Sequence, residues 1–168
     1  ILERKYISDR SGEKRLTIAG SKNVRQRLEL LCELAYPGSL DSMLSKINWI
    51  DIPESDIWTF ERFKVRHDPK SEPHGWMMTH KNGWSILHSG DSGPCEELWN
   101  RVKLCKLVVI EMSVPETVDT QSHHKPSQIS KLANDCPDTQ FLLTHTYIDI
   151  DYKILTTDSP DLPNNVTI

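Results

Sequence analysis

Alternation of apolar and polar residues marks several segments of the chain as β-strands. Residues 56–66 fall into two alternating sets of side chains, a period-two pattern that is typical of a strand with two different faces. Residues 107–111 and 141–145 are short apolar runs, typical of strands that are covered on both faces. Shorter extended segments are expected at 16–20 and 47–52. The pattern therefore predicts a sheet of several short strands.

Two further strands are predicted to form a hairpin. Residues 75–79 and 84–88 have strand-like composition, and Lys81-Asn82-Gly83 separates them. An Asn-Gly pair favours a tight turn because both residues tolerate a positive φ. We therefore expect the second strand to fold back directly on the first.

Helical spacing and capping signals mark four segments as helices. The first is expected over 22–35, with Ser21 as its N-cap. A shorter helix is expected within 40–47, a third from Pro94 to about residue 104, and a fourth over 126–134. Pro94 suits the first position of its helix. The apolar side of the first helix comprises Val24, Leu28, Leu31 and Leu34. Strands and helices that alternate in this way predict a mixed α/β (α+β) fold.

A sharp turn joins the strand at 84–88 to the helix that follows it. Ser89 to Pro94 contains two glycines and a proline, and Asp91 lies between Gly90 and Gly93. In α/β sheets, ligand-binding and catalytic groups collect at the carboxyl ends of strands. Asp91 is therefore a candidate functional residue. The alternative is that it only caps the turn or the helix, as most aspartates in such turns do.

Histidines follow two other predicted strands. His67 ends the strand at 56–66, His145 ends the strand at 141–145, and His123 and His124 lie in a loop just before a helix. A single histidine is more often a surface or core-edge residue than a ligand. Side chains at the ends of several strands converge on one edge of a sheet, however, and two imidazoles with one carboxylate suit zinc or a similar transition metal.

Composition limits the classes of function that the chain can have. The 168 residues are 37% hydrophobic and 26% charged, which is enough for one globular domain with a core. The net charge of −4 gives no strong basic footprint for nucleic acid, although a local basic patch stays open. The sequence shows no apolar run of membrane-spanning length and no signal peptide. No membrane partner is therefore expected.

The cysteines indicate a reducing compartment. Cys32, Cys95, Cys105 and Cys136 are widely scattered, and no C-x-x-C pair occurs, which argues against a structural zinc knuckle. We interpret them as reduced thiols of a cytoplasmic protein.

Three motifs resemble those of one family. Ser89-Gly90-Asp91-Ser92-Gly93-Pro94 is similar to an S-G-D-T-G-P turn, and Leu142 to Tyr147 is similar to a terminal L-T-H motif. Val65-Arg66-His67, followed by Gly75 to Met78, is similar to V-x-H…G-Y-x-I. Together they resemble the second half of a metallo-β-lactamase-fold hydrolase. The phosphodiesterase branch is the nearest, meaning class II cyclic-nucleotide phosphodiesterases and the transfer-RNA 3′-processing endonuclease Z.

The resemblance implies a set of metal ligands. His67 would bind the first metal ion, Asp91 would bridge two ions, and His145 would bind the second. The implied cofactors are two divalent metal ions, with zinc as the first choice and manganese or iron as alternatives.

Two further matches imply the remaining roles. Val109 to Pro115 resembles an I-E-x-S-F-P strand and turn, and His123-His124-Lys125-Pro126 resembles H-S-T-P, whose first histidine donates a proton to the leaving group. Alignment through Pro126 selects His123 as that donor, with His124 as the backup. Glu111 is a candidate partner that orients a ligand histidine. The alternative is that Glu111 is an ordinary carboxylate at a strand end.

The family's strongest motif, H-x-H-x-D-H, does not occur in the sequence. The resemblance implies a four-layer αββα sandwich, of which residues 1–168 would be a single domain that lacks the segment with this motif. That segment either precedes Ile1 or has been lost. Both ends of the sequence look cut from a longer chain, which favours the first explanation. Three ligands are too few for two metals, so we expect a weak or empty metal site in this chain, with Asp91 paired to a histidine instead.

The predicted function is metal-dependent hydrolysis of a phosphodiester by a metal-activated hydroxide, with a cyclic nucleotide or an RNA end as the substrate. The fragment by itself is expected to be inactive, and a homodimer is compatible with the sequence. Two alternatives stay open. One is a hydrolase of the same fold that acts on a lactone, thioester or sulfate ester. The other is a non-catalytic module that keeps the fold for binding.

Overall fold

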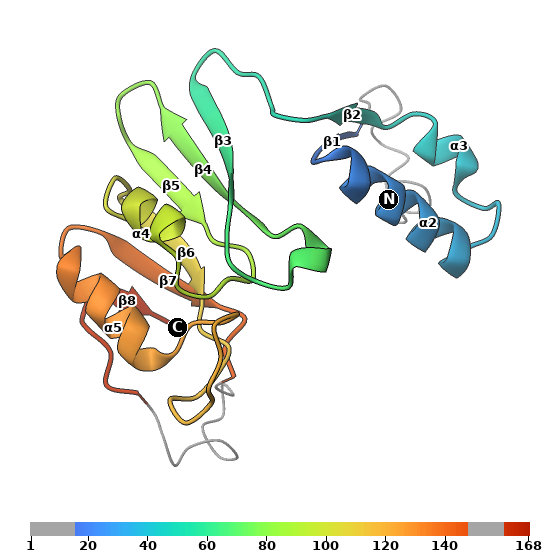
Figure 1. Cartoon of the computed structure of the whole chain (residues 1–168). Coiled ribbons are helices and arrows are strands. Elements are labelled where there is room, and N and C mark those ends of the chain that lie inside the picture. The colour runs from blue at the N-terminus through green and yellow to red at the C-terminus, as the bar shows by residue number, and fades with distance from the viewer. Residues whose placement is uncertain (1–15, 148–159) are drawn as a thin grey trace. The chain divides into compact units, whose positions relative to one another are not determined.

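The computed structural model describes residues 16–147 and 160–168 (Figure 1). The chain divides into two compact units, residues 1–53 and 54–168. The predicted single domain over residues 1–168 stays a prediction. The candidate site residues all lie in the second unit.

The first unit contains a small parallel sheet and two helices. β1 (Thr17–Ala19) pairs with β2 (Asn48–Ile50), and α2 (Lys22–Ala35) and α3 (Asp41–Leu44) connect them. Ser21 caps α2, since its hydroxyl oxygen accepts a hydrogen bond from the backbone N–H of Val24 at 3.3 Å. The predicted cap and the bounds of the helix at 22–35 are confirmed, whereas the strands expected at 16–20 and 47–52 and the helix expected within 40–47 are shorter than their predicted ranges.

The apolar side of α2 is not buried as its spacing predicts. Val24, Leu31 and Leu34 are 40%, 62% and 73% exposed, whereas Cys32 is the buried residue of this helix. The physical reason lies in the size of the sheet. Two strands of three residues offer too little surface to cover one side of a 14-residue helix.

The second unit is built around a six-stranded sheet with the order β3-β4-β5-β6-β7-β8 (Figure 1). Neighbouring strands are antiparallel from β3 to β5 and parallel from β5 to β8. The elements in chain order are β3 (Trp58–Lys64), the short 3₁₀ helix η2 (Pro69–Ser71), β4 (His74–His80), β5 (Ser85–His88), α4 (Glu96–Val102), β6 (Leu107–Glu111), α5 (Pro126–Asp135), β7 (Gln140–Thr144) and β8 (Val166–Thr167).

The predicted hairpin joins β4 to β5. Gly83 has a φ of 86°, and the side-chain oxygen of Asn82 accepts a hydrogen bond from the N–H of Trp84 at 3.1 Å. Glycine adopts this left-handed backbone without a steric penalty, so the sequence fixes the turn locally.

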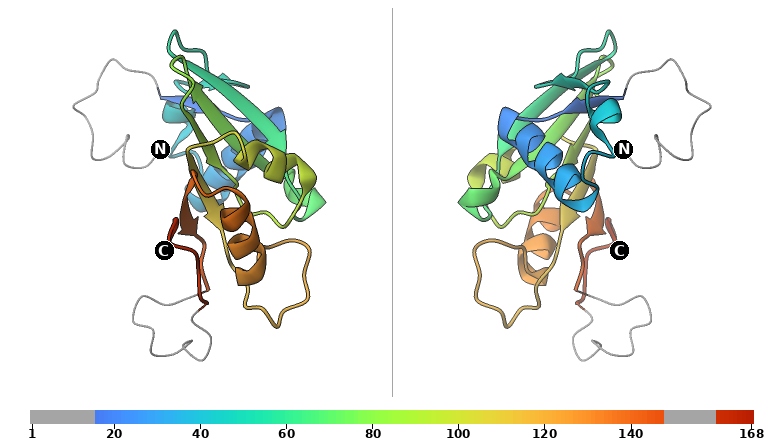
Figure 2. Two further views of the ribbon diagram at one scale, coloured as in Figure 1. Left: turned by 90° about the vertical axis from the view of Figure 1, so that its left-hand side faces the viewer. Right: turned by 90° about the vertical axis from the view of Figure 1, so that its right-hand side faces the viewer.

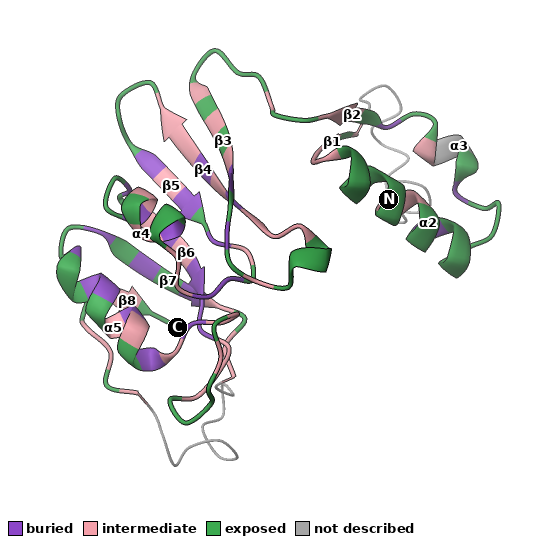
Figure 3. Cartoon of the chain, in the orientation of Figure 1, coloured by how far each residue is buried: buried purple, intermediate pink, exposed green. Residues whose placement is uncertain are grey.

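Helices α4 and α5 pack into one core on the same side of the sheet (Figure 2). Leu98 of α4 and Ile129 of α5 are fully buried with Leu87, Val108 and Ile110 of the central strands. Figure 3 shows the buried residues alternating along these strands with partly exposed ones.

Burial corrects one prediction about the central strands. Phe141 and Leu143 of β7 face the core, but Leu142 between them is 41% exposed. The predicted strand at 141–145 is therefore covered on one face within this unit, and not on both.

The start of α4 also differs from the prediction. Cys95 is its N-cap, with φ −151° and ψ 149°, so Pro94 lies before the helix rather than at its first position. The reason is a bridge between Gly93 and Arg66, in which the N–H of Gly93 donates to the carbonyl oxygen of Arg66 at 2.7 Å. This bond holds the chain extended past Gly93 and delays the first helical turn.

Asn165 ties the C-terminal segment to the core unit. Its side-chain NH₂ group lies within hydrogen-bond distance of three carbonyl oxygens, those of Ala133 at 3.1 Å, Cys136 at 3.2 Å and Thr139 at 2.9 Å. These carbonyls belong to the end of α5 and to the turn into β7. Asn165 therefore closes the C-terminal end of α5, whose last carbonyls have no partner inside the helix.

Replacing Asn165 with alanine should lower the free energy of unfolding by about 1–3 kcal/mol, because partly buried carbonyl oxygens lose their donor. Asn164→Ala is the matched control, since Asn164 is exposed and a surface change of this kind is worth less than about 0.5 kcal/mol. Urea unfolding of both variants measures the difference. Equal losses of unfolding free energy in the two variants would contradict a stabilising role for the hydrogen bonds of Asn165.

Candidate functional site

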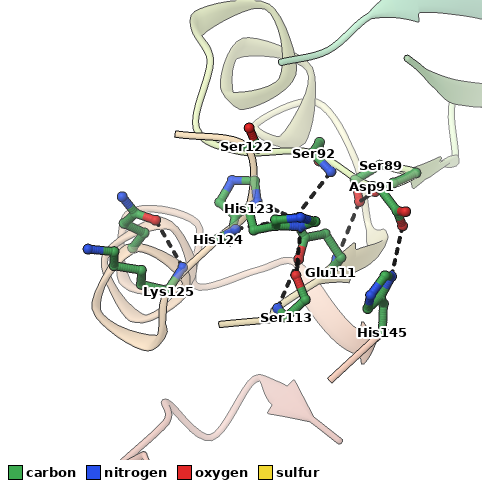
Figure 4. Close-up of polar contacts among 12 residues, drawn as sticks. Ser89, Asp91, Ser92, Glu111, Ser113, Ser122, His123, His124, Lys125 and His145 are labelled. Carbon is green, nitrogen blue, oxygen red and sulfur yellow. Dashed lines mark hydrogen bonds and ion pairs between the residues drawn. The ribbon is translucent and has the colours of Figure 1, made fainter. Parts of the chain in front are cut away.

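Four loops at one edge of the large sheet bring the predicted site residues together. His67 follows β3, Asp91 follows β5, His123 precedes α5 and His145 follows β7. The Nδ1 atom of His145 lies 2.9 Å from a carboxylate oxygen of Asp91 (Figure 4). The ring centre of His123 lies 4.9 Å from that of His67 and 5.9 Å from that of His145. The expected pairing of Asp91 with a histidine is thus present, and it involves His145.

Behind these residues lies a fully buried carboxylate, that of Glu111 at the end of β6. One oxygen accepts hydrogen bonds from the backbone N–H groups of Ser92 and His124, each at 3.2 Å. The other accepts from the N–H of Ser113 at 2.9 Å and from its hydroxyl at 2.6 Å. A buried charge is tolerated when hydrogen bonds satisfy it, so Glu111 holds three separate loops against one group.

The same carboxylate orients His123. The Nδ1 atom of His123 lies 3.2 Å from Glu111 and 2.7 Å from the hydroxyl oxygen of Ser113 (Figure 4). The hydroxyl of Ser113 donates a hydrogen bond to Glu111. A carboxylate can only accept, and the Ser113 hydroxyl already donates to it, so these neighbours favour the tautomer in which Nδ1 carries the hydrogen. The second ring nitrogen, Nε2, is then the one left for acid–base chemistry. The side chain is 24% exposed, so it can reach a substrate.

His124 occupies a different environment although it is the next residue. Its side chain is fully buried, and its Nε2 atom accepts a hydrogen bond from the indole N–H of Trp99 at 3.3 Å. Burial is the main cause that lowers the pKa of His124 from 6.5 to about 4; a backbone hydrogen bond with Ser92 opposes the shift, and the neighbouring His123 adds to it. The ring is therefore neutral and packed, and it is poorly suited to donate a proton near neutral pH.

Gly93 lets two of the site loops approach each other. A Cβ atom at this position would lie 1.9 Å from the carbonyl oxygen of Gln121 and 3.0 Å from the backbone nitrogen of His123. The side chain of Arg66 also donates a hydrogen bond to the side-chain oxygen of Gln121 at 2.9 Å. The loops that carry His67, Asp91 and His123 therefore meet around Gly93, where only glycine fits.

His145 has a strained backbone. Its φ of 47° lies in the left-handed region, which residues with a Cβ rarely adopt. The hydrogen bond to Asp91 accompanies this conformation and aims the ring at the aspartate. Strain of this kind persists where the surroundings determine the backbone, and it gathers at functional sites.

Sequence reasoning missed the residues that support the site. The sequence alone does not single out Ser113, which binds Glu111. It also does not single out Ser89, whose hydroxyl donates to the carbonyl of Gly90 at 2.6 Å and accepts from the N–H of Glu111 at 3.3 Å. A signal was present, because Ser89 and Ser113 lie inside the matched motifs. The sequence predicts Glu111 as a candidate partner that orients a ligand histidine, whereas the histidine ring that it contacts is that of His123, the proton-donor candidate.

The donor types at the edge fit a divalent transition metal, but the described residues supply only part of a site. His67, Asp91 and His145 offer two imidazoles and one carboxylate, and the side chains of Asp91 and His145 are about half exposed. Within residues 16–147 and 160–168, however, no group of three or more His, Cys, Asp or Glu side chains is arranged to hold an ion. Further ligands are needed to complete one.

Comparison with known proteins identifies the fold. The family model described as "Beta-lactamase superfamily domain" matches residues 6–146. No curated protein matches the chain. No helix in the described part of the chain has the length and apolar character needed to cross a membrane.

Three solved structures share the architecture. The metallo-β-lactamase fold protein YhfI from Bacillus subtilis is 16% identical with a TM-score of 0.60, over 83% of this chain and 55% of YhfI. A diphosphatase from the PhnP family is 12% identical with a TM-score of 0.62, over 94% of this chain and 56% of its own. A long-form RNase Z from yeast is 14% identical with a TM-score of 0.66, over 97% of this chain and 27% of its own.

These matches confirm the predicted metallo-β-lactamase fold. The chain spans about half the length of YhfI and of the diphosphatase, and about a quarter of the yeast RNase Z.

Replacing Gly93 with alanine should lower the free energy of unfolding by about 1–3 kcal/mol, because the added methyl group overlaps the backbone at Gln121. Gly20→Ala is the matched control. There the added Cβ would meet only side-chain atoms of Val24, the nearest a methyl group at 3.3 Å, and no backbone atom. Urea unfolding measures both variants, and a loss at Gly20 as large as that at Gly93 would show that the close approach is not the cause.

The buried His124 should make stability depend on pH. Its folded pKa of about 4 lies below the unfolded value of 6.5, so between these values the unfolded chain binds more protons and stability falls as the pH falls. His124→Gln should flatten this dependence by about 1.4 kcal/mol per pH unit while it keeps an acceptor for Trp99.

Urea unfolding across this pH range tests the effect. His124→Phe should flatten the dependence equally. Its stability should be lower than that of His124→Gln at every pH, since the indole N–H of Trp99 loses its acceptor. Unchanged pH dependence in both variants would contradict a neutral His124.

Proposed function

The chain belongs to the β-lactamase superfamily domain family, and from this premise we propose that it is part of a metal-dependent hydrolase of phosphodiester bonds. One observation carries the proposal. The histidine and aspartate side chains at the strand ends face one another, and a separate histidine beside them is held by a buried carboxylate. A hydrolytic site needs both a place for a metal and a positioned acid.

His67, Asp91 and His145 are the residues that would hold metal, together with ligands from outside the described residues. A bound divalent ion supplies a hydroxide near neutral pH and offsets negative charge on phosphoryl oxygens. The donor set favours zinc, with manganese or iron as alternatives, and the family resemblance supports two ions. The half-exposed pair of Asp91 and His145 is accessible to an ion from solvent.

His123 acts as the general acid in this proposal. Its Nδ1–H is engaged by Glu111 and Ser113, so the transferable proton is the one on Nε2. That proton goes to the oxygen that leaves phosphorus, since an unprotonated alkoxide is a poor leaving group. Glu111 and Ser113 contribute by fixing the plane of the ring and by keeping hydrogen on Nδ1.

Phosphodiesters are the substrate class that the comparisons support most. Two of the similar structures are described as a diphosphatase and an RNase Z, both of which take their names from phosphate-containing substrates. Hydrolysis of a lactone, thioester or sulfate ester is the alternative that the same site residues leave open. Turnover of bis-p-nitrophenyl phosphate against a panel of lactones separates these classes.

Variants of three residues should separate metal binding from proton donation in the full-length polypeptide. Asp91→Ala should lower metal content and turnover together, because it removes a ligand. His123→Ala should keep the metal and slow an alkoxide-releasing substrate by about 10²–10⁴-fold. That loss should shrink for a substrate that releases p-nitrophenolate, which departs without a proton.

His124→Gln is the matched control, because His124 is buried against Trp99 and outside the proposed chemistry. Metal analysis and rates on both substrates are measured for all three variants. If His123→Ala removes metal, or slows both substrates equally, the assignment of His123 as proton donor is wrong. If His124→Gln shows the leaving-group dependence instead, the donor is the neighbouring residue.

A further inference from the structure

Two adjoining hollows form a groove beside the candidate site, between the edge strand β3 and helix α4. One has a volume of about 570 Å³ and is lined by residues 62–66 together with Cys95, Glu97 and Arg101. The other, of about 430 Å³, is lined by Arg66 and by residues of the 94–103 segment. Arg66 and Cys95 line both, so the hollows are continuous. We call this the β3–α4 groove.

The charge in the β3–α4 groove is positive although the chain as a whole carries −4. Arg101 binds Glu61 at 2.6 Å and Glu97 at 2.9 Å, so this cluster of one cation and two carboxylates is net negative. The remaining charged residues that line the groove are one carboxylate and four cations: Glu96, Arg62, Lys64, Arg66 and Lys103. Lys64, Arg66 and Lys103 are exposed. The groove therefore attracts an anion with more than one charge.

Arg66 links the groove to the candidate site. It directly precedes His67, its carbonyl oxygen binds the N–H of Gly93, and its guanidinium binds Gln121 in the loop of His123. Lys64 also lines a third hollow, of about 380 Å³, which contains His67. A linear polymer whose reacting bond lies at the candidate site would thus continue into the groove past Lys64 and Arg66.

An aromatic side chain lies along the same path. Trp99 lines the second hollow, is partly exposed, and is held in place by the hydrogen bond from its indole N–H to His124. Single-stranded nucleic acids are bound by grooves that combine cations along the backbone with aromatic rings on which bases stack. A mononucleotide has only one phosphate and needs no such groove.

We infer that the β3–α4 groove binds the phosphate backbone of a single-stranded nucleic acid, so that the substrate of the site is a polynucleotide rather than a cyclic mononucleotide. This inference rests on the proposed phosphodiester hydrolysis. Lys64, Arg66 and Lys103 contact successive phosphates, and Trp99 stacks on a base beyond the reacting bond.

Binding and hydrolysis are tested separately. The full-length polypeptide is titrated, with metal chelated so that nothing is cleaved, into a fluorescent single-stranded RNA roughly 12 nucleotides long. Fluorescence anisotropy is measured between about 50 and 200 mM salt. The variants are Lys64→Gln, Lys103→Gln and their combination, and Lys131→Gln is the matched control. Lys131 is an exposed lysine on α5 that pairs with Asp135 outside the groove.

Each groove substitution should reduce the slope of log affinity against log salt by roughly 0.7, and the double variant by about twice that. Lys131→Gln should leave the slope unchanged, and a cyclic mononucleotide should not displace the RNA. A single-stranded DNA of the same length tests whether the sugar matters, and binding of RNA, with or without the DNA, supports the inference.

Absence of RNA binding, or an equal effect of Lys131→Gln, overturns the inference. Hydrolysis of bis-p-nitrophenyl phosphate by the unmodified polypeptide is scored independently. Hydrolysis without RNA binding would reject the groove as an RNA-binding site but would keep the proposed function. RNA binding without hydrolysis removes the proposed function, and with it the assignment of the groove as part of a substrate site.

Discussion

Burial of the Glu111 carboxylate is the constraint on which the arrangement of the site depends. The group has no exposure, so it is stable only while Ser92, Ser113, His123 and the backbone of His124 all bind it. These partners lie in three segments: Ser92 in the turn after β5, Ser113 in the segment after β6, and His123 and His124 in the loop before α5. Satisfying one buried charge therefore fixes three loops at once. This network positions Asp91, which adjoins Ser92, and His123, which contacts the carboxylate directly.

Much of the fold follows from local signals in the sequence. The Ser21 cap, the Asn82-Gly83 turn and the strand at 107–111 are specified by residues adjacent in the chain, and they form as predicted. The convergence of His67, Asp91 and His145 also follows from local signals, because strand ends share an edge. Local signals do not predict which side chains are buried, because burial depends on packing between elements. The apolar side of α2 has helical spacing, but nothing in the small β1–β2 sheet is large enough to bury it.

The supporting contacts of the site could not be predicted because they join residues that are far apart in the chain. Gly93 looks like an ordinary turn glycine, and only the folded chain shows that the carbonyl of Gln121 excludes a side chain there. The pattern of charge behaves in the same way. Lys64 and Lys103 are unremarkable in a chain of net charge −4, yet β3 and α4 bring them to one groove. Composition averages over the surface, whereas binding depends on where the charges lie.

The two adjacent histidines show how burial divides roles that the sequence leaves open. His123 and His124 have the same chemistry and differ by one position in register. The buried ring of His124 has a pKa near 4 and packs on Trp99, while the ring of His123 keeps one nitrogen for solvent. His124 also supports the orientation of His123, because its backbone N–H donates a hydrogen bond to the Glu111 carboxylate that His123 contacts. Burial therefore separates the two histidines into one that a substrate can reach and one that is packed in the core.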